Sequence, residues 1–361
     1  MSHRIAVLPG DGIGPEETAS AVRVLRAVLP DATFTEGAVG ASAIATHGTP
    51  IPDETLALCR ASDAVLFGAV GGNGFEHLTP DKRPEAAILG LRKAFSLYAN
   101  VRPSRVFPGL ESRSPLRPEL ATGMDLVLIR ELTGGLYFGP RSLEEEDGVL
   151  TARDTLVYRD FEIERIAHFA FALARTRRKH VTSIDKSNVI ISSQLWRRIV
   201  IEVARDYPDV TLEHMLVDNA AMQLVRDPRA FDVLLTENMF GDILSDEAAM
   251  ITGTIGTAPS ASIGAPPDTK PFGLYEPISG TAPDIVGKGI ANPAASILSA
   301  AMLARFSLGE TAVADTIDTA VAEALRTGPR TPDLDGPGGV STEAFTDAVL
   351  ARIGTPVSLR A

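Results

Sequence analysis

The chain has 361 residues, with 34 basic and 46 acidic side chains, so its formal net charge at pH 7 is −12. This charge argues against a nucleic-acid-binding protein, because phosphate contacts need clustered Lys and Arg. The single cysteine, Cys59, excludes an internal disulfide and a cysteine-based zinc site. No apolar run approaches the roughly 18 residues of a membrane span, and the N-terminal apolar stretch is too short for a signal peptide. We therefore expect a soluble, cytoplasmic α/β protein.

Short apolar runs alternate with longer amphipathic patterns along the chain, which is typical of an α/β fold. The first expected helix illustrates the pattern, with Pro15 in its first turn and Ala19, Val22 and Leu25 on one face. The expected strands are 4–8, 64–67, 126–130, 181–184 and 233–235. The expected helices are 15–29, 85–98, 161–175, 297–306 and 342–353.

Three segments interrupt this alternation. Residues 103–120 contain four prolines and are expected to form a loop or crossing segment. Residues 256–273 are rich in Gly, Pro, Ser and Ala and are expected to form a loop near a domain junction. Residues 139–156 contain an acidic run followed by a polar, β-like stretch. We interpret this segment as a projecting arm, although a solvated charge run explains the acidic residues equally well.

The glycines of Gly10-Asp11-Gly12-Ile13-Gly14 follow an expected strand and open an expected helix. Glycines at that position are compatible with a Rossmann dinucleotide-binding site, in which phosphate would bind at the helix N-terminus and Glu36 would be the ribose-binding acid. The spacing is GxGxG rather than GxGxxG, however. A plain strand–turn–helix corner explains these glycines equally well, so we do not expect a Rossmann site.

Asp242 and Asp246 are four residues apart, so on a helix they share one face. Two carboxylates on one face suit Mg²⁺ or Mn²⁺, with water completing the coordination shell. Helix capping by Asp242 beside a solvated Asp246 is the alternative, and it is favoured when the pair is taken alone. Asp218 is a third candidate ligand. None of the six histidines lies at ligand spacing from another, so a histidine metal site is not expected.

Five further side chains are candidates for binding or proton transfer. Arg92, Arg102 and Arg130 lie on an expected helix, before a proline and at a strand end, where arginine can bind a dicarboxylate. Taken singly, each is more often a surface or structural ion-pair residue. Lys186 follows an expected strand and Tyr137 follows a glycine pair, so they are candidates for a base and an acid. Spacing alone does not establish those roles.

Longer sequence blocks extend over nearly the whole chain. They are LPGDGIGPE, GAVGG, LRKAFSLYANVRP, IRELTGGLYFG, SIDKSNV, VDNAAMQL, ENMFGDILSDEAAMITG and YEPISGTAPDIVGKGIANPAASIL. Together they resemble the isocitrate/isopropylmalate dehydrogenase family of β-decarboxylating dehydrogenases. The resemblance implies a two-domain fold that shares a large mixed β-sheet flanked by helices and is not a Rossmann fold. The cofactor-binding domain would comprise 1–99 and 251–361, and the dimerisation and metal/substrate domain 100–250.

The resemblance also implies a homodimer with shared active sites, in which the arms at 139–156 pair with each other. Each site would borrow Lys186, Val189 and Asp218 from the partner subunit. Asp218 would then join Asp242 and Asp246 as a ligand of Mg²⁺ or Mn²⁺, while the three arginines hold the malate carboxylates.

The same resemblance assigns the chemical steps. Lys186 would take the hydroxyl proton while hydride leaves C2 of the substrate for NAD. Loss of CO₂ from the resulting 2-oxo acid would follow, and Tyr137 would help to protonate the enol carbon.

Substrate and cofactor choice follow from the resemblance residue by residue. Isocitrate dehydrogenases carry Ser and Asn where this chain has Ala86 and Ile88. Ile88 and Leu89, with Val189 of the partner, would form an apolar wall for an isopropyl group, where a buried carboxylate would be costly. Glu85 would lie beside the nicotinamide. The implied reaction is oxidative decarboxylation of 3-isopropylmalate to 4-methyl-2-oxopentanoate and CO₂ in leucine biosynthesis.

Asp284 resembles the acid that accepts hydrogen bonds from the adenosine ribose, and its charge would repel the 2′-phosphate of NADP. NAD is therefore the expected cofactor. The remaining expected cofactor contacts are Gly71, Gly72, Gly280, Thr281, Ala282, Pro283, Ile285 and Asn292. Ser279 departs from the pattern, because many relatives carry His there beside the adenine. This departure puts the adenine contact in doubt.

Three alternatives stay open. The same chemistry on D-malate or tartrate is one, and a non-catalytic binding paralogue is another. A metal-dependent lyase or isomerase that works without nicotinamide is the third. No nucleic-acid or membrane partner is expected.

Overall fold

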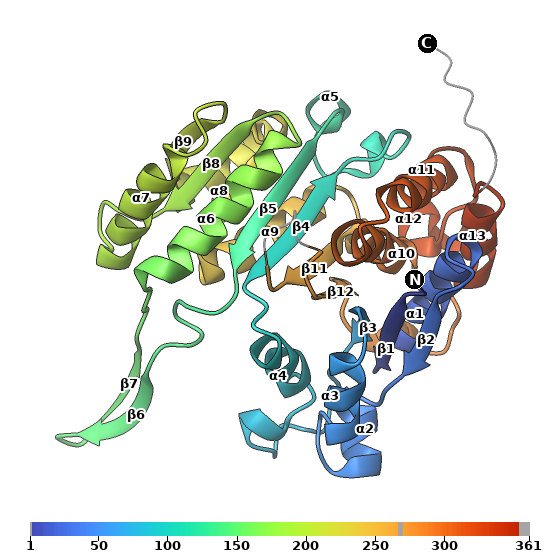
Figure 1. The fold of residues 1–361 in the computed structure, drawn as a ribbon, viewed down its shortest axis with the longest axis horizontal. Coiled ribbons are helices and arrows are strands. Elements are labelled where there is room, and N and C mark those ends of the chain that lie inside the picture. The colour runs from blue at the N-terminus through green and yellow to red at the C-terminus, as the bar shows by residue number, and fades with distance from the viewer. Residues whose placement is uncertain (1, 266–269, 354–361) are drawn as a thin grey trace.

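The computed structural model describes residues 2–265 and 270–353. A ten-stranded mixed sheet, ordered β2-β1-β3-β12-β11-β4-β5-β10-β8-β9, runs through the molecule (Figure 1). The strands are β1 (Arg4–Gly10), β2 (Thr33–Glu36), β3 (Ala64–Ala69), β4 (Ala99–Arg105), β5 (Asp125–Glu131), β8 (His180–Asp185), β9 (Thr211–Leu216), β10 (Val233–Thr236), β11 (Pro259–Ile263) and β12 (Gly273–Pro277). The antiparallel pairs β12–β11, β11–β4 and β4–β5 lie at its centre, and parallel pairs lie on both sides.

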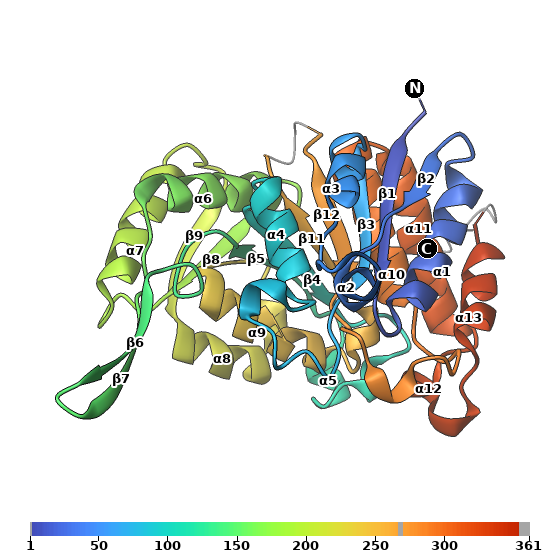
Figure 2. The same ribbon diagram turned by 90° about the horizontal axis from the view of Figure 1, so that it is seen from below.

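Helices cover both faces of this sheet. They are α1 (Gly14–Val28), α2 (Gly40–His47), α3 (Asp53–Arg60), α4 (Ala86–Ala94), α5 (Pro118–Ala121), α6 (Asp160–Arg175), α7 (Ile191–Ala204), α8 (Val217–Arg226), α9 (Asn238–Ile251), α10 (Ala294–Leu303), α11 (Thr311–Thr327), α12 (Pro332–Asp335) and α13 (Thr342–Leu350). Figure 2 shows α6 and α9 on opposite sides of the strands between them. Among the described residues, no helix has the length and apolar character needed to cross a bilayer.

The apolar core is continuous on one face of the sheet and divided on the other. On the continuous face, α1, α6, α7, α10, α11 and α13 contribute to one cluster. On the opposite face, one cluster lies beneath α8 and α9 and a separate one beneath α3 and α4. The divided face leaves the middle of the sheet uncovered by apolar side chains.

Polar side chains from the central strands occupy that division. Asn100 and Arg102 lie on β4, Ser260 and Ser262 on β11, and Glu276 on β12. Their sequence neighbours on the same strands belong to the continuous core. Because successive strand residues point to opposite faces, the pleat directs this polar set into the gap between the two smaller clusters.

The large mixed sheet flanked by helices confirms the predicted fold class, and its strand order is not that of a Rossmann fold. The predicted domain border falls where β11 pairs with β4, between strands of 1–99 and 251–361 and strands of 100–250. That two-domain division stays a prediction.

Two predicted segments are wrong. The helix expected over 85–98 ends at Ala94, since Ser96 has a φ of 52° and the chain enters β4 at Ala99. The loop expected over 256–273 contains β11, a central strand of the sheet. Its small polar residues hide the strand pattern, because Ser260 and Ser262 face the gap and accept hydrogen bonds from Asn100.

The prolines of 103–120 also do not mark a loop throughout. Pro103 lies within β4, beyond Val101, where the pairing with β11 ends. Its missing N–H therefore costs no hydrogen bond in that ladder. Pro118 opens the short helix α5.

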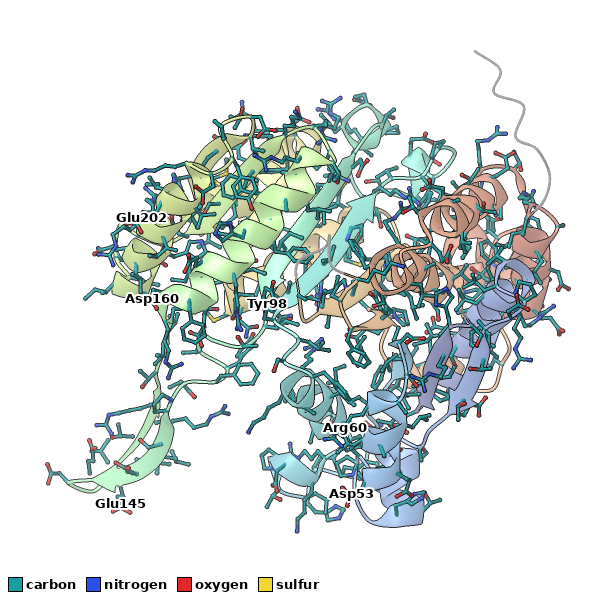
Figure 3. The ribbon with its side chains drawn as sticks, viewed as in Figure 1. Asp53, Arg60, Tyr98, Glu145, Asp160 and Glu202 are labelled. Atoms are coloured by element: carbon teal, nitrogen blue, oxygen red, sulfur yellow. The ribbon has the colours of Figure 1, made fainter. Side chains whose placement is uncertain are left out.

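The segment 139–156 forms an exposed hairpin of β6 (Arg141–Glu146) and β7 (Val149–Asp154). It projects from the body of the molecule in both ribbon views, with Glu145 near its tip (Figure 3). Leu143, Val149 and Leu150 are each more than 60% exposed. A two-stranded hairpin with an exposed apolar edge gains little stability alone, so we expect this arm to pack against another surface.

Candidate active site

A pocket of about 260 Å³ opens over the divided face of the sheet. Its lining comes from the end of β3, from α4, from β4, from α9, and from the end of β12 with the segment after it. The lining side chains that carry charge are Glu85, Arg92, Arg102, Asp242, Asp246 and Glu276. Ile88 and Ile278 contribute apolar surface. The pocket therefore combines two carboxylates of one helix, two arginines and an apolar side.

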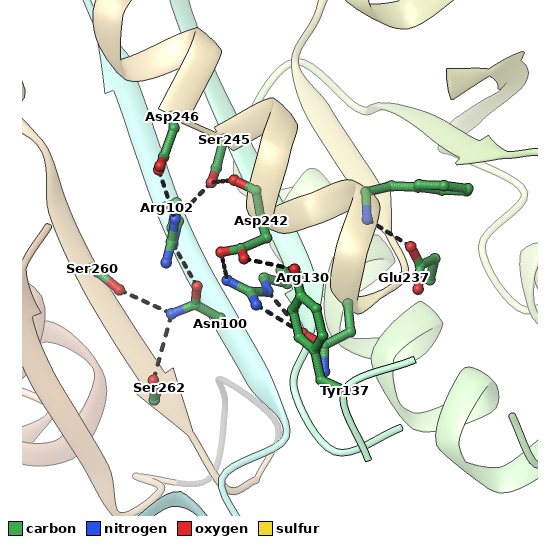
Figure 4. A network of polar contacts seen from close by, with 12 residues as sticks. Asn100, Arg102, Arg130, Tyr137, Glu237, Asp242, Ser245, Asp246, Ser260 and Ser262 are labelled. Atoms are coloured by element: carbon green, nitrogen blue, oxygen red, sulfur yellow. Dashed lines mark hydrogen bonds and ion pairs between the residues drawn. The ribbon is translucent and has the colours of Figure 1, made fainter. Parts of the chain in front are cut away.

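The two pocket arginines are held in place by fixed acceptors. Arg92 Nη2 donates to Glu276 Oε1 at 3.0 Å, and both side chains are mostly buried. Arg102 Nε donates to Asn100 Oδ1 at 2.7 Å, and its Nη1 donates to Ser245 Oγ at 2.7 Å (Figure 4). Burial, and secondarily the charge of Arg92, lowers the pKa of Arg102. A bound carboxylate would relieve that repulsion between cations.

Asp242 connects the third predicted arginine to the predicted acid (Figure 4). Its Oδ1 accepts a hydrogen bond from Arg130, and its Oδ2 accepts one from the Tyr137 hydroxyl at 3.0 Å. Burial lowers the pKa of Arg130 to about 10, so the guanidinium stays charged at neutral pH. Burial and the Asp242 carboxylate raise the pKa of Tyr137, which therefore keeps its proton.

The aspartates of α9 suit a hard divalent cation. Asp242 and Asp246 lie one turn apart and both line the pocket, and the Asp246 side chain is 75% exposed. Carboxylate oxygens with free lone pairs are the donors that Mg²⁺ and Mn²⁺ prefer. Within the described residues of one chain, no three acidic, His or Cys side chains group as a cation site. Water can complete the coordination shell of such a cation, and the contribution of Asp218 as a third protein ligand stays a prediction.

Lys186 and Asp218 contact each other, with Nζ to Oδ1 at 2.6 Å, and neither lines the pocket of their own chain. The hydrogen bond from Lys186 lowers the pKa of Asp218. Lys186 follows β8, Asp218 lies in the first turn of α8, and nearby Val189 is 68% exposed. The structure thus brings these three predicted residues together at a surface outside the pocket.

The predicted cofactor segments lie at one end of the pocket. Gly71 has a φ of 141°, and a Cβ there would lie 3.3 Å from Glu85 Oε1 and 3.5 Å from Thr281 Cγ2. Gly71, Glu85 and Thr281 are therefore neighbours, and Gly280 lines the pocket. Gly72 and Gly280 also have positive φ values, so side-chain-free backbone forms this end of the pocket.

The rest of the predicted cofactor set is more dispersed. Pro283, Asp284 and Ile285 form a short 3₁₀ turn, in which Asp284 is exposed, after Ala282 with a φ of 39°. Asn292 is buried, and its amide donates to Asp333 Oδ2 at 2.9 Å. Leu89 is 48% exposed on α4 and does not line the single-chain pocket.

The GDGIG corner supports this region instead of forming a phosphate loop. Asp11 accepts from the backbone N–H groups of Ala41, Ser42 and Gly71. The Ile13 N–H donates to the Thr281 carbonyl at 3.1 Å. These donors and acceptors are used internally, which matches the strand–turn–helix interpretation of the glycines.

A family model described as isocitrate/isopropylmalate dehydrogenase matches residues 4–349. The chain belongs to this family. It is 55% identical to a 3-isopropylmalate dehydrogenase of Geobacillus kaustophilus over 96% of this chain and 95% of that protein. A 3-isopropylmalate dehydrogenase of Methylococcus capsulatus is 53% identical over 98% and 99% of the two chains.

Solved structures agree with the family assignment. The crystal structure of an isocitrate dehydrogenase from Methylococcus capsulatus matches with a TM-score of 0.86 and 36% identity, over 98% of this chain and all of the other. A β-decarboxylating dehydrogenase from Thermococcus kodakarensis in its apo form matches with a TM-score of 0.81 and 39% identity, over 97% and 96%. The chain is accordingly an oxidoreductase of this family.

Several polar residues around the site of this family member escaped the sequence analysis. They are Asn100, Asn238, Ser245 and Glu276. Each lies inside or beside a block that was recognised, but the uncharged amides and hydroxyl carry no signal of their own, and Glu276 is a single acid without a second one at helix spacing. Only the contacts with the arginines reveal their positions in the site.

Ser279, the departure from the family pattern, points toward α1. Its hydroxyl lies 3.1 Å from both carboxylate oxygens of Glu17, which is entirely buried. Burial raises the Glu17 pKa from 4.5 to about 8. The unfolded chain therefore loses this proton at lower pH than the folded chain, and stability falls as pH rises between those two pKa values.

We expect Glu17→Gln to remove that pH dependence. The variant should match the wild type below pH 4.5 and exceed it above pH 8 by about 5 kcal/mol in free energy of unfolding. Urea unfolding at pH 5, 7 and 9 measures the difference. Parallel stability curves for the two proteins would contradict the buried, raised-pKa carboxyl.

Proposed function

We propose that this protein is a 3-isopropylmalate dehydrogenase. It would catalyse the NAD-dependent, Mg²⁺- or Mn²⁺-dependent oxidative decarboxylation of 3-isopropylmalate to 4-methyl-2-oxopentanoate and CO₂ in leucine biosynthesis, in the cytoplasm. The observation that carries the proposal is the pocket lining. Arg92 and Arg102 face two aspartates of one helix, while Ile88 contributes an apolar side. The names of the curated relatives support the same substrate.

The arginines account for binding a substituted malate. Arg92, Arg102 and Arg130 keep guanidinium N–H groups that can donate to two carboxylates. Ile88 stands where a charged third carboxylate of isocitrate would need a polar partner, and burial of that charge would be unfavourable. The lining therefore favours an alkyl substituent at C3.

When bound, the divalent cation supplies a Lewis acid at the substrate oxygen, and NAD supplies a hydride acceptor. Asp242 and Asp246, with Asp218 of the partner subunit, would hold the cation. Lys186 of the partner subunit would receive the proton of the C2 hydroxyl. Tyr137, which keeps its proton beside Asp242, would deliver one to the enol carbon after CO₂ leaves.

The cofactor end of the pocket is compatible with NAD. Gly71, Gly72 and Gly280 leave backbone accessible, and Glu85 lies beside Gly71. The exposed Asp284 carboxylate would accept from ribose hydroxyls and would repel a 2′-phosphate.

The proposal includes a homodimer with shared sites. Lys186 and Asp218 lie outside the pocket of their own chain, beside a surface with large exposed apolar side chains. These are Val189, Ile191, Met222, Val225 and Ile243, all at least half exposed. A surface with several large exposed apolar side chains supports a subunit interface at this place. The two-domain division at 1–99 with 251–361 and 100–250 belongs to the same proposal.

Formation of NADH from 3-isopropylmalate, D-malate, isocitrate and tartrate tests the function. We expect turnover with 3-isopropylmalate, its loss with EDTA, and its recovery with Mg²⁺ or Mn²⁺. Preference for D-malate or tartrate would favour that alternative. Product formation without NAD would indicate a lyase or isomerase, and no turnover with any of the four would indicate a binding paralogue.

Leu89 tests the apolar wall. We expect Leu89→Ser to raise the KM for 3-isopropylmalate about tenfold to a hundredfold, because the alkyl group loses apolar contact in the proposed dimeric site. The KM for D-malate, which has no alkyl group, should change little. Steady-state kinetics with both substrates makes the comparison, and equal losses would remove Leu89 from the pocket.

A further inference from the structure

Asn238, the first residue of α9, uses its whole side chain inside the protein. Its Oδ1 accepts from Arg130 Nε at 3.0 Å and from Arg130 Nη2 at 2.9 Å. Its Nδ2 donates to the Gly134 carbonyl at 3.0 Å. The residue is only 1% exposed, and its backbone N–H donates to the Tyr158 hydroxyl. The side-chain oxygen of Asn238 therefore contacts Arg130, whereas its side-chain N–H contacts the loop that contains Gly134.

The two contacts close a ring of polar interactions. Arg130 also donates to Asp242, and Asp242 accepts from Tyr137, which follows Gly134 in the same loop. The ring passes from Asn238 through Arg130, Asp242, Tyr137 and Gly134 back to Asn238. Displacement of the amide would therefore move a substrate-binding arginine and an acid relative to each other.

Gly134 and Gly135 allow the loop before Tyr137 to lie close to Asn238 and Tyr158. Gly135 has a φ of 81°, and a Cβ there would lie 2.9 Å from the Tyr158 hydroxyl and 3.3 Å from Asn238 Cβ. A Cβ on Gly134 would lie 2.7 Å from Tyr158 Cε1. The loop can thus lie against Asn238 and Tyr158 only without side chains at these two positions.

We propose that Asn238 is a positioning residue that holds the Arg130 guanidinium and the Tyr137 hydroxyl at a fixed position relative to each other. Its oxygen fixes the plane of the guanidinium, so that the remaining N–H groups face the substrate. Its amide N–H fixes the loop that carries the Tyr137 hydroxyl. This inference rests on the proposed function, because it assigns substrate binding to Arg130 and proton delivery to Tyr137.

Asn238→Asp separates the two contacts. The carboxylate keeps an acceptor for Arg130 but has no N–H for the Gly134 carbonyl. We expect kcat to fall about 10–100-fold, as for a catalytic group misplaced by about an ångström, while the KM for 3-isopropylmalate changes by less than about threefold. Asn238→Ala removes both contacts, so KM should rise about tenfold in addition.

Double-mutant cycles distinguish positioning from a general loss of structure. In a Tyr137→Phe background, Asn238→Asp should lower kcat by less than about twofold, because the group that it positions is already gone. Asn100→Asp is the matched control. Asn100 accepts from Arg102 and donates to Ser260 and Ala261, away from the Tyr137 loop, so its effect should multiply with Tyr137→Phe.

Multiplicative effects of Asn238→Asp and Tyr137→Phe would overturn the inference. Should Asn238→Asp fail to fold, Gly135→Ala displaces the same loop while keeping both hydrogen-bonding groups of the Asn238 amide, and it should lower kcat with KM unchanged. Unchanged kcat in that variant would also overturn the inference. A wild-type enzyme that fails to oxidise 3-isopropylmalate would instead refute the proposed function, whatever the cycle shows.

Discussion

Asp242→Asn is expected to lower kcat/KM for 3-isopropylmalate by about a thousandfold or more. The Asp242 carboxylate has three roles: it pairs with Arg130, it accepts a hydrogen bond from Tyr137, and it is a ligand of the proposed cation. Asparagine keeps the shape but loses the charge on which the first and third depend. Kinetics at saturating NAD, with Mg²⁺ varied, measures the loss.

Asp209→Asn is a matched control for that experiment. The Asp209 side chain is 40% exposed, like that of Asp242, and it also pairs with an arginine, Arg175, at 2.8 Å. It lies outside the pocket, and activity should stay within twofold of wild type. Retention of a tenth of the wild-type kcat/KM by Asp242→Asn would refute the cation site on α9.

Lys186→Met is expected to lower kcat by about 10²–10⁴-fold, because it removes the proposed acceptor of the hydroxyl proton. The KM for 3-isopropylmalate should change far less, since the arginines bind the carboxylates. Steady-state kinetics of the purified variant tests this. An unchanged kcat would show that another group takes the proton.

Mixed dimers show whether that lysine acts across subunits. Unfolding and refolding Lys186→Met together with Asp242→Asn gives dimers that combine the two chains. If Lys186 serves the partner's site, a mixed dimer has one intact site, and an equal mixture regains about a quarter of wild-type activity. If both residues serve their own chain, every site is defective and no activity returns.

Sequence patterns predicted the buried strands better than the strands beneath the pocket. β3, β5 and β10 are mainly apolar and β8 is almost entirely buried, and each was expected close to its observed position. β4 and β11 were missed because each has a polar face, formed by Asn100 and Arg102 on β4 and by Ser260 and Ser262 on β11, in the gap between the two smaller core clusters. An alternating pattern that mixes Asn, Arg and Ser with small residues does not differ locally from a loop.

In the site, too, some residues were predicted from local sequence patterns and others were missed. Asp242, Asp246 and the arginines were found because charged groups at helix spacing or strand ends suggest chemistry. Asn238 lies in the same sequence block and was overlooked. Its importance depends on two partners, Arg130 and Gly134, that are about a hundred residues away in the chain. A local sequence pattern does not predict contacts between residues so far apart in the chain.

The order of strands in the sheet also constrains how the chain acquires its structure during synthesis. β3 pairs with β12, which is translated roughly two hundred residues later, and β4 waits for β11 on one side. By contrast, β4, β5, β8, β9 and β10 emerge without interruption. The strands β4, β5, β10, β8 and β9 can therefore pair before β11 and β12 are synthesised, while β3 and β4 each keep an open edge, accessible to chaperones, until those two strands arrive.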